Sequence, residues 1–173
     1  MTGSGRVATD DRFSTLFFDR AERLVRLAAL LRADDPEDVV QEAFCNVFAA
    51  RRRLKGTDEQ VAAYLTRAVV NEVRDRARRS AIFRRDAHLV ATSSSTPPGV
   101  DPTERDAVTR AVAALPERQR EAVVLRFWLD LSLAQVAEAM GTRVGTAKAH
   151  VSRGLAAVAA QLETEDESGR GPR

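Results

Sequence analysis

One segment of this chain combines basic and small side chains and contains no acid. No aspartate or glutamate occurs from Ala139 to Leu162, and helical spacing within this segment gathers hydrogen-bond donors on one face. Guanidinium, ammonium and hydroxyl groups beside positions that are nearly free of side chain can approach phosphates and base edges in a major groove. This face predicts contact with nucleic acid, and its residues are Arg143, Gly145, Thr146, Lys148, Ala149, Ser152 and Arg153.

A second group of donors follows helical spacing further upstream. It combines one aromatic ring, one amide and three guanidinium groups at intervals of three and four residues, opposite an apolar face. An aromatic ring stacks on an unpaired base, and arginines beside it hold backbone phosphates. The alternative is a solvated face with charge pairs along the helix, and the residue types alone support both interpretations equally. The group consists of Tyr64, Arg67, Asn71, Arg74 and Arg78.

An acidic helix precedes both groups. Five acids and no basic residue lie between Asp34 and Asn46. Such a face repels DNA, so a macromolecular partner would have to be a basic protein surface. A merely solvated face is the favoured interpretation from charge alone. The residues that project away from the apolar side of this helix are Glu37, Asp38, Gln41, Glu42 and Asn46.

The charge is unevenly distributed along the chain, although the formal net charge is only +2. Residues 10–50 contain nine acids and five arginines, a balance of −4, whereas residues 51–85 contain eleven basic residues and four acids, a balance of +7. Separate partners for the two segments are one explanation, and a local lattice of salt bridges is the other.

Several kinds of chemistry have no residues to support them. His88 and His150 are the two histidines and Cys45 is the one cysteine, too few for the usual zinc clusters. No glycine-rich phosphate loop or HExxH pattern occurs, so we expect no metal, no cofactor and no enzymatic activity. The lone cysteine, expected to fill a small space in the core, favours a cytoplasmic protein. No apolar run approaches the roughly 18 residues that span a bilayer, and residues 1–11 lack the apolar core of a signal peptide.

Two short helices must position the basic face, and the sequence marks their ends. Ser132 caps the first helix, Gln135 completes a capping box, and Gly141 ends the helix in a left-handed conformation. The segment 131–155 is therefore a helix-turn-helix or, as the alternative, an ordinary helical hairpin with solvated basic residues. We expect the second helix to bury Val144, Ala147, Val151, Leu155, Val158 and Leu162.

The chain as a whole divides into two helical blocks. Apolar periodicity predicts helices at about 13–31, from Pro36 onward and at about 59–79, then at about 103–114 and 117–129 before the helix-turn-helix. The Ser, Thr and Pro-rich stretch 91–102 cannot supply a core. The fold class is therefore all-α, with two small helical domains joined by a flexible linker. The expected divisions are a disordered N-terminus at 1–10, domains at 11–85 and 104–162, a linker at 86–103 and a disordered tail at 163–173.

Four motifs in a fixed order point to one family. They are DPEDVVQEAF, AAYLTRAVVNEVRDRARR, then after the linker LPERQREAVVLRFWLDLS, and the helix-turn-helix. Each motif is moderately specific, but their order is strong evidence. Over residues 13–80 and 106–162 the chain resembles the small, two-domain bacterial RNA polymerase sigma factors of the extracytoplasmic-function group. The resemblance implies that the first domain is the three-helix bundle of sigma region 2 and that the second is sigma region 4.

The resemblance also implies a partner for each face. The minus-thirty-five promoter element would meet Lys148, Ala149, Ser152 and Arg153. The stripe from Tyr64 to Arg78, with the preceding loop 51–57, would read and open the minus-ten element of promoter DNA. An anti-sigma factor is a further expected partner, and the linker would thread toward the polymerase active-site channel. The residues that would dock on the clamp helices of core RNA polymerase are Asp35, Asp38, Gln41, Glu42 and Asn46.

The sequence departs from the family pattern at the two DNA sites. Tyr64 stands where relatives often have tryptophan. Thr142 and Arg143 stand where a small apolar residue and a serine are usual, so we expect the recognition helix to be capped at Thr142, which leaves Arg143 for DNA. Two other functions compete with the sigma factor: a stand-alone helix-turn-helix regulator with an N-terminal interaction domain, and an adaptor that uses the acidic helix alone.

Overall fold

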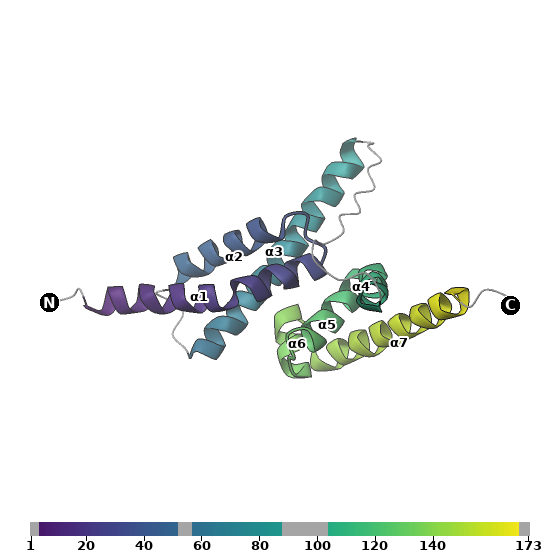
Figure 1. Ribbon diagram of the computed structural model, residues 1–173. Helices are drawn as coiled ribbons and strands as arrows, with labels where there is room; N and C mark the ends of the chain where they lie inside the picture. Colours follow the sequence, from purple (N-terminus) through teal and green to yellow (C-terminus); the bar gives the residue numbers. More distant parts are fainter. Residues whose placement is uncertain (1–3, 52–56, 88–103, 170–173) are drawn as a thin grey trace. The chain divides into compact units, whose positions relative to one another are not determined.

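Seven helices make up the regular structure of residues 4–51, 57–87 and 104–169, which are the residues that the structure describes (Figure 1). Over these ranges the computed structural model contains no strand, so the predicted all-α fold is confirmed. The chain forms two compact units, one of residues 1–28 and 33–89 and the other of residues 29–32 and 90–173. Most of the expected linker, from residue 88 to residue 103, lies outside the described residues.

The first unit holds most of α1 (Ser4–Leu30), together with α2 (Pro36–Ala50) and α3 (Asp58–Ala87). Helix α2 packs against α3, and each of the three helices contributes aliphatic side chains from one face to the core. The opposite faces of α2 and α3 remain in solvent. The buried side chains of the unit include Leu24, Leu27, Ala28, Val39, Val40, Ala43, Val47, Val61, Ala62, Leu65, Val69, Val70 and Val73.

Local sequence is sufficient to start α2. Asp35 occupies the N-cap position in an extended conformation, and its Oδ1 accepts the backbone N–H of Asp38 at 3.0 Å. Pro36 takes a first-turn position, where a missing N–H has no consequence for the helix. Glu37 and Asp38 lie near the positive end of the helix dipole. The acidic helix therefore begins where the sequence predicts.

The second unit contains α4 (Glu104–Ala114), α5 (Glu117–Phe127), α6 (Leu133–Met140) and α7 (Val144–Gly169). Helix α7 packs against the other three helices, and α5 also contacts α4 and α6. The position of α7 is therefore determined from three sides. The core of the unit includes Ala111, Leu115, Ala122, Val123, Val124, Leu125, Val136, Ala137, Ala139, Met140, Ala147 and Val151.

The ends of α6 have the predicted chemistry. Ser132 Oγ accepts the Gln135 N–H at 3.3 Å, and Gln135 Oε1 accepts the Ser132 N–H at 2.9 Å, so the capping box is present. Gly141 ends the helix with a φ of 63°, a left-handed conformation in which a Cβ would be strained. Its N–H donates to the carbonyl of Glu138 at 3.1 Å. The predicted helix-turn-helix is confirmed.

Three helices are longer than the periodicity predicted. Helix α1 begins at Ser4 and α7 ends at Gly169, whereas residues 1–10 and 163–173 were expected to lie outside the helices. The extension of α7 is tied to α4 by an ion pair of 3.0 Å between Arg110 Nη2 and Glu165 Oε2. Helix α3 continues past residue 79 to Ala87, since no proline or glycine interrupts it.

Cys45 is exposed, which corrects its assignment as a core residue. Helix α2 buries Ala43 and Val47, each two residues from the cysteine in sequence. Two helical positions correspond to about 200° around the axis, so Cys45 faces away from the core. Residue type suggested burial, and helical geometry decided against it.

Candidate nucleic-acid and protein interfaces

The acid-free face of α7 lies in solvent because the opposite side of the helix is buried. Ala147 is 0% and Val151 8% exposed, and together they seat α7 on the unit. A Cβ added at Gly145 would meet nothing within 4 Å, so the helix surface there is open to close approach. Among the residues predicted for this face Ala149 is half-buried, and the exposed ones are Arg143, Gly145, Thr146, Lys148, Ser152 and Arg153.

The buried stripe of α7 departs from the prediction, since two of its six residues are exposed and Val158 and Leu162 are half-buried. Val144 and Leu155 were expected inside, but they are 49% and 42% exposed. The stripe passes instead through buried Gly154, where α7 approaches Val123 of α5. Position 154 continues the helical period from Val151 as well as position 155 does, and a residue without a side chain allows the closer approach.

Arg143, and not Thr142, occupies the N-cap position of α7. Its carbonyl accepts the N–H of Ala147 at 3.0 Å, whereas the Thr142 N–H donates to Ala137 at 2.9 Å. The expected cap at Thr142 is wrong, because that residue still belongs to the turn that closes α6. The exposed Arg143 side chain lies beside the N-terminus of α7, a position that favours phosphate.

Arginines of α5 hold the neighbouring helix ends, a role that the sequence analysis missed. Arg126 Nη1 donates to the Leu131 carbonyl at 2.8 Å, just before α6 begins. Arg120 Nη1 donates to the carbonyls of Ala113 at 3.1 Å and Leu115 at 3.0 Å, which satisfies acceptors at the end of α4. Burial lowers the pKa of the Arg120 guanidinium. The Arg126 bond therefore connects α5 to the start of the helix-turn-helix, and the Arg120 bonds connect α5 to the end of α4.

His150 lies on α7 with its Nδ1 buried and without a hydrogen-bond partner. Burial lowers the pKa of its imidazole, and repulsion by Arg153 and Arg118 lowers that pKa further. The ring is therefore neutral at pH 7. Among the described residues, no three His, Cys, Asp or Glu side chains gather in a way that could hold a metal ion.

The aromatic and basic stripe of α3 is presented to solvent. Tyr64 is 44% exposed. Arg74 Nη1 donates to Asn71 Oδ1 at 3.4 Å, so these two members of the stripe lie together. Arg74 is half-buried, and the other predicted residues, Arg67, Asn71 and Arg78, are exposed. Residues 52–56 of the preceding loop lie outside the described residues.

The acidic face of α2 is exposed, but some of its carboxylates have partners within the protein. Asp35 is the helix cap described above. Asp38 Oδ2 lies 2.6 Å from Nη1 of Arg76 on α3, although its side chain remains 58% exposed. Gln41, Glu42 and Asn46 project into solvent. The face predicted to dock on a protein is thus present, with one member engaged by α3.

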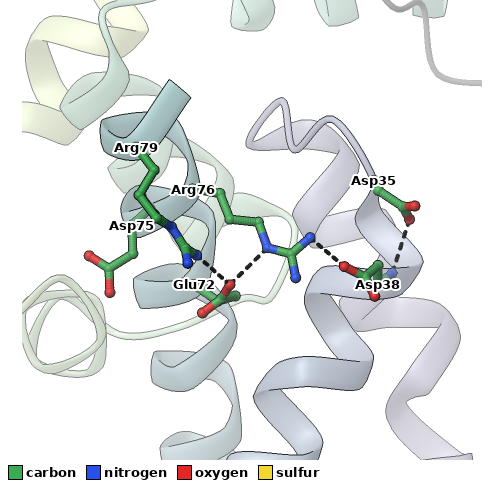
Figure 2. Close-up of polar contacts among 6 residues, drawn as sticks. All are labelled: Asp35, Asp38, Glu72, Asp75, Arg76 and Arg79. Carbon is green, nitrogen blue, oxygen red and sulfur yellow. Dashed lines mark hydrogen bonds and ion pairs between the residues drawn. The ribbon is translucent and has the colours of Figure 1, made fainter. Parts of the chain in front are cut away.

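A cluster between α2 and α3 was missed by the sequence analysis (Figure 2). Arg76 Nε donates to Glu72 Oε1 at 2.8 Å, and Arg79 Nη2 lies 3.0 Å from the same oxygen. The Glu72 side chain is only 16% exposed. Pairing with Glu72 and then with Asp38 raises the pKa of Arg76 against the effect of burial. Within α3 the sequence did contain a signal for these ion pairs, because Arg76 and Arg79 follow Glu72 by four and seven residues. Nothing in the sequence indicated the contact of Arg76 with α2.

Two parts of the chain match known families. Residues 17–82 match Sigma-70 region 2, and residues 105–158 match Sigma-70, region 4. The ECF RNA polymerase sigma factor SigM of Mycobacterium tuberculosis (strain H37Rv) is 33% identical over 156 residues, which cover 87% of this chain and 76% of SigM. The chain belongs to the ECF RNA polymerase sigma factors. The family that the sequence resembles is therefore confirmed.

Further relatives of this sigma factor agree in sequence and in fold. The RNA polymerase sigma-E factor of Streptomyces antibioticus is 32% identical over 164 residues, which cover 89% of this chain and 86% of the relative. The sigma factor RpoE of Bartonella quintana, solved with the anti-sigma factor NepR, has a TM-score of 0.75 at 22% identity, covering 87% of this chain and 96% of RpoE. CnrH, solved with the cytosolic domain of CnrY, has a TM-score of 0.66 at 23% identity, covering 92% and 97%.

As a sigma factor, the protein binds core RNA polymerase and directs promoter-specific initiation of transcription. Region 2 serves the minus-ten element and region 4 the minus-thirty-five element. The presence of both regions disfavours a stand-alone helix-turn-helix regulator. No helix within the described residues is long and apolar enough to cross a membrane.

Proposed function

We propose that three exposed faces of this sigma factor divide the work of initiation. The acidic face of α2 docks on a basic surface of core RNA polymerase, the stripe of α3 reads and opens the minus-ten element, and the face of α7 reads the minus-thirty-five element. The observation that carries this proposal is the exposure of the acid-free face of α7 above buried Ala147 and Val151. Arg153 Nε donates to the Ala149 carbonyl of the same helix at 3.2 Å, but the side chains of Arg143, Lys148 and Arg153 are exposed and can be reached by DNA.

On α7, small and long side chains have different parts in reading the minus-thirty-five element. Gly145 and Ala149 allow the helix to enter the groove closely, and Lys148 between them reaches a base acceptor. Arg143 and Arg153 hold phosphates on either side. Thr146 and Ser152 add hydroxyl groups that donate to phosphates or base edges.

On α3, Tyr64 supplies the ring on which an unpaired base stacks once the minus-ten element opens. Asn71 offers an amide to a base edge, and Arg67, Arg74 and Arg78 hold the backbone. Promoter opening needs both the aromatic ring and the basic side chains. Stacking on the ring replaces the stacking that a base loses when it leaves the duplex.

On α2, the solvent-facing Gln41, Glu42 and Asn46 form the centre of the docking face, with Asp38 beside them. Asp35 contributes mainly by starting the helix, since one of its carboxylate oxygens accepts the Asp38 N–H. A negative face of this kind steers the sigma factor toward positive charge on the polymerase and repels DNA.

The proposal includes an anti-sigma factor as a regulatory partner. Two solved relatives are complexes with such partners or with a cytosolic domain, at identities of 22% and 23%. We place the protein in the cytoplasm, where core polymerase and promoters are found. The protein acts by binding and positioning, without catalytic chemistry or a cofactor of its own.

Run-off transcription with purified core polymerase tests the docking face. Gln41→Arg/Glu42→Arg should abolish co-purification with core polymerase and run-off product, because both side chains are exposed and the charge of the face is reversed. These positions are preferable to Asp38, whose replacement by arginine would also break a contact with α3.

Asp19→Arg provides a matched control, since this exposed acid lies on α1 of the same unit. The control should bind core polymerase as the unmodified protein does. Undiminished binding by the double variant, with its helicity intact, would show that the acidic face is only solvated.

A further inference from the structure

One guanidinium joins the docking helix to the DNA-reading helix. Arg76 of α3 uses Nε for Glu72 of its own helix, at 2.8 Å, and Nη1 for Asp38 of α2, at 2.6 Å (Figure 2). The planar guanidinium carries these two donors on different nitrogens at a fixed angle, so it reaches both acids with a set geometry, whereas an ammonium offers only one nitrogen. Arg79 holds the same Glu72 oxygen from the other side at 3.0 Å.

The cluster is more buried toward α3 and more open toward α2. Glu72 is 16% exposed and Arg76 29%, whereas Asp38 is 58% exposed. The ion pair between Glu72 and Arg76 is therefore screened from water, while Asp38 can still contact a partner. The backbone N–H of Asp38 is held as well, by Asp35 Oδ1 at 3.0 Å. The carboxylate is thus oriented from both its main chain and its side chain before any partner arrives.

The position of Arg76 on α3 separates it from the DNA-reading stripe. It follows Tyr64 by twelve residues, which corresponds to about 120° around the helix. Arg76 therefore faces α2, while the stripe faces solvent. The negative charges of Glu72 and Asp38 offset the positive charges of Arg76 and Arg79. The charge of Arg76 is used inside the unit and is not offered to phosphates.

We propose that Arg76 is a positioning residue, which holds Asp38 in the orientation that core polymerase recognises and couples α2 to the DNA-reading helix α3. This inference rests on the docking role proposed for α2. Without Arg76 the carboxylate would sample several rotamers, and ordering it on binding would weaken the complex. Arg76 would act on polymerase binding only through Asp38.

A double-mutant cycle measures this coupling directly. The affinity of the full-length protein for core polymerase from the same organism is measured at one salt concentration for the unmodified chain, Arg76→Gln, Asp38→Asn and the double variant. Arg76→Gln should weaken binding about three- to tenfold. Asp38→Asn should cause a smaller loss in the Arg76→Gln background than in the unmodified chain, because the two residues act as a unit.

Two further variants separate positioning from charge and from general stability. Arg76→Lys keeps the charge but replaces the rigid planar fork by a single nitrogen on a flexible stem, so it should rescue less than half of the loss in binding free energy. Arg79→Gln is the matched control, because it also removes a contact with Glu72 but none with Asp38, and its affinity should stay within about twofold. If Arg76→Gln does not fold, Glu72→Gln should give the same coupling, since it loosens the anchor without altering Asp38.

The outcomes distinguish this inference from the proposed function. Asp38→Asn without effect in the unmodified chain would overturn the docking role of Asp38 and the inference with it. A different result would overturn the inference alone. In that case Asp38→Asn weakens polymerase binding, while a folded Arg76→Gln variant binds polymerase as tightly as the unmodified chain or more tightly. Full rescue by Arg76→Lys would show that a positive charge at this position suffices and would overturn the inference that the guanidinium geometry orients Asp38.

Discussion

Gly154 of α7 lies so close to Val123 of α5 that an added Cβ would be 2.6 Å from Val123 Cγ2. The same Cβ would be 3.3 Å from the carbonyl oxygen of Gln119, so the backbone of α5 is near as well. The helix that carries the proposed minus-thirty-five face therefore sits on α5 through the absence of a side chain. Its orientation depends on this close approach.

Gly154→Ala should lower the free energy of unfolding of the second unit by about 1 kcal/mol. Overpacking typically destabilises by about 1–3 kcal/mol, and the better helix propensity of alanine offsets about 1 kcal/mol of this. Denaturant unfolding followed by circular dichroism measures the change. Gly145→Ala is the control in the same helix, since its Cβ would meet nothing within 4 Å, and it should be neutral or slightly stabilising. Equal shifts for the two variants would refute the steric explanation.

Lys148 and Arg153 should affect promoter selection differently. Lys148→Ala should relax the preference at one or two base pairs of the minus-thirty-five element, by about 1–3 kcal/mol each, because a base contact is lost. Arg153 lies about 140° further around α7, so Arg153→Ala should weaken all promoters alike and reduce the salt dependence by about one phosphate contact. Transcription from a promoter library compares them, and identical sequence profiles would rule out the distinction.

Replacing Tyr64 should impair promoter opening more than initial binding. Tyr64 is 44% exposed, and Tyr64→Ala removes its ring, for which loss of one stacked base typically corresponds to about 1–3 kcal/mol. Tyr64→Phe keeps the ring and should open promoters normally. Permanganate reactivity of unpaired thymines in the holoenzyme complex measures opening. Normal opening with the alanine variant would remove Tyr64 from the proposed minus-ten site.

His150 should make the second unit less stable as the pH falls below its ordinary pKa of 6.5. Burial lowers the pKa in the folded protein, so the unfolded chain takes up the proton first and is stabilised by it. The stabilising effect of the neutral ring is complete above about pH 6.5 and is lost progressively below it. The free energy of unfolding is measured from about pH 7.5 down to about pH 5.5. It should fall more steeply for the unmodified chain than for His150→Gln. Parallel curves would contradict the buried, neutral assignment.

Short-range features of the fold could be predicted from the sequence because their causes lie within a few residues. The capping box of Ser132 and Gln135 and the left-handed turn at Gly141 are satisfied inside one or two helical turns. The exposure of the α7 face followed in the same way from the helical period. The binding roles of these faces remain predictions, since they depend on partners.

Other features required the packed structure. Arg76 and Asp38 are far apart in sequence, and only the packing of α2 on α3 brings their charges to 2.6 Å. The sequence gives no sign of the role of Arg120, because only the packing of α5 against α4 brings its guanidinium to the carbonyls of Ala113 and Leu115.

The sequence by itself determined that the chain is helical, where its helix-turn-helix begins and turns, and to which family it belongs, because capping, periodicity and motif order are properties of neighbouring residues. Tertiary structure alone decided which side of a helix each borderline residue occupies, as Cys45 and Leu155 show by their exposure. The reason is physical: the helical period allows adjacent positions to be buried equally well. The neighbouring helix that packs closest then decides which position is buried, as Val123 of α5 does at Gly154.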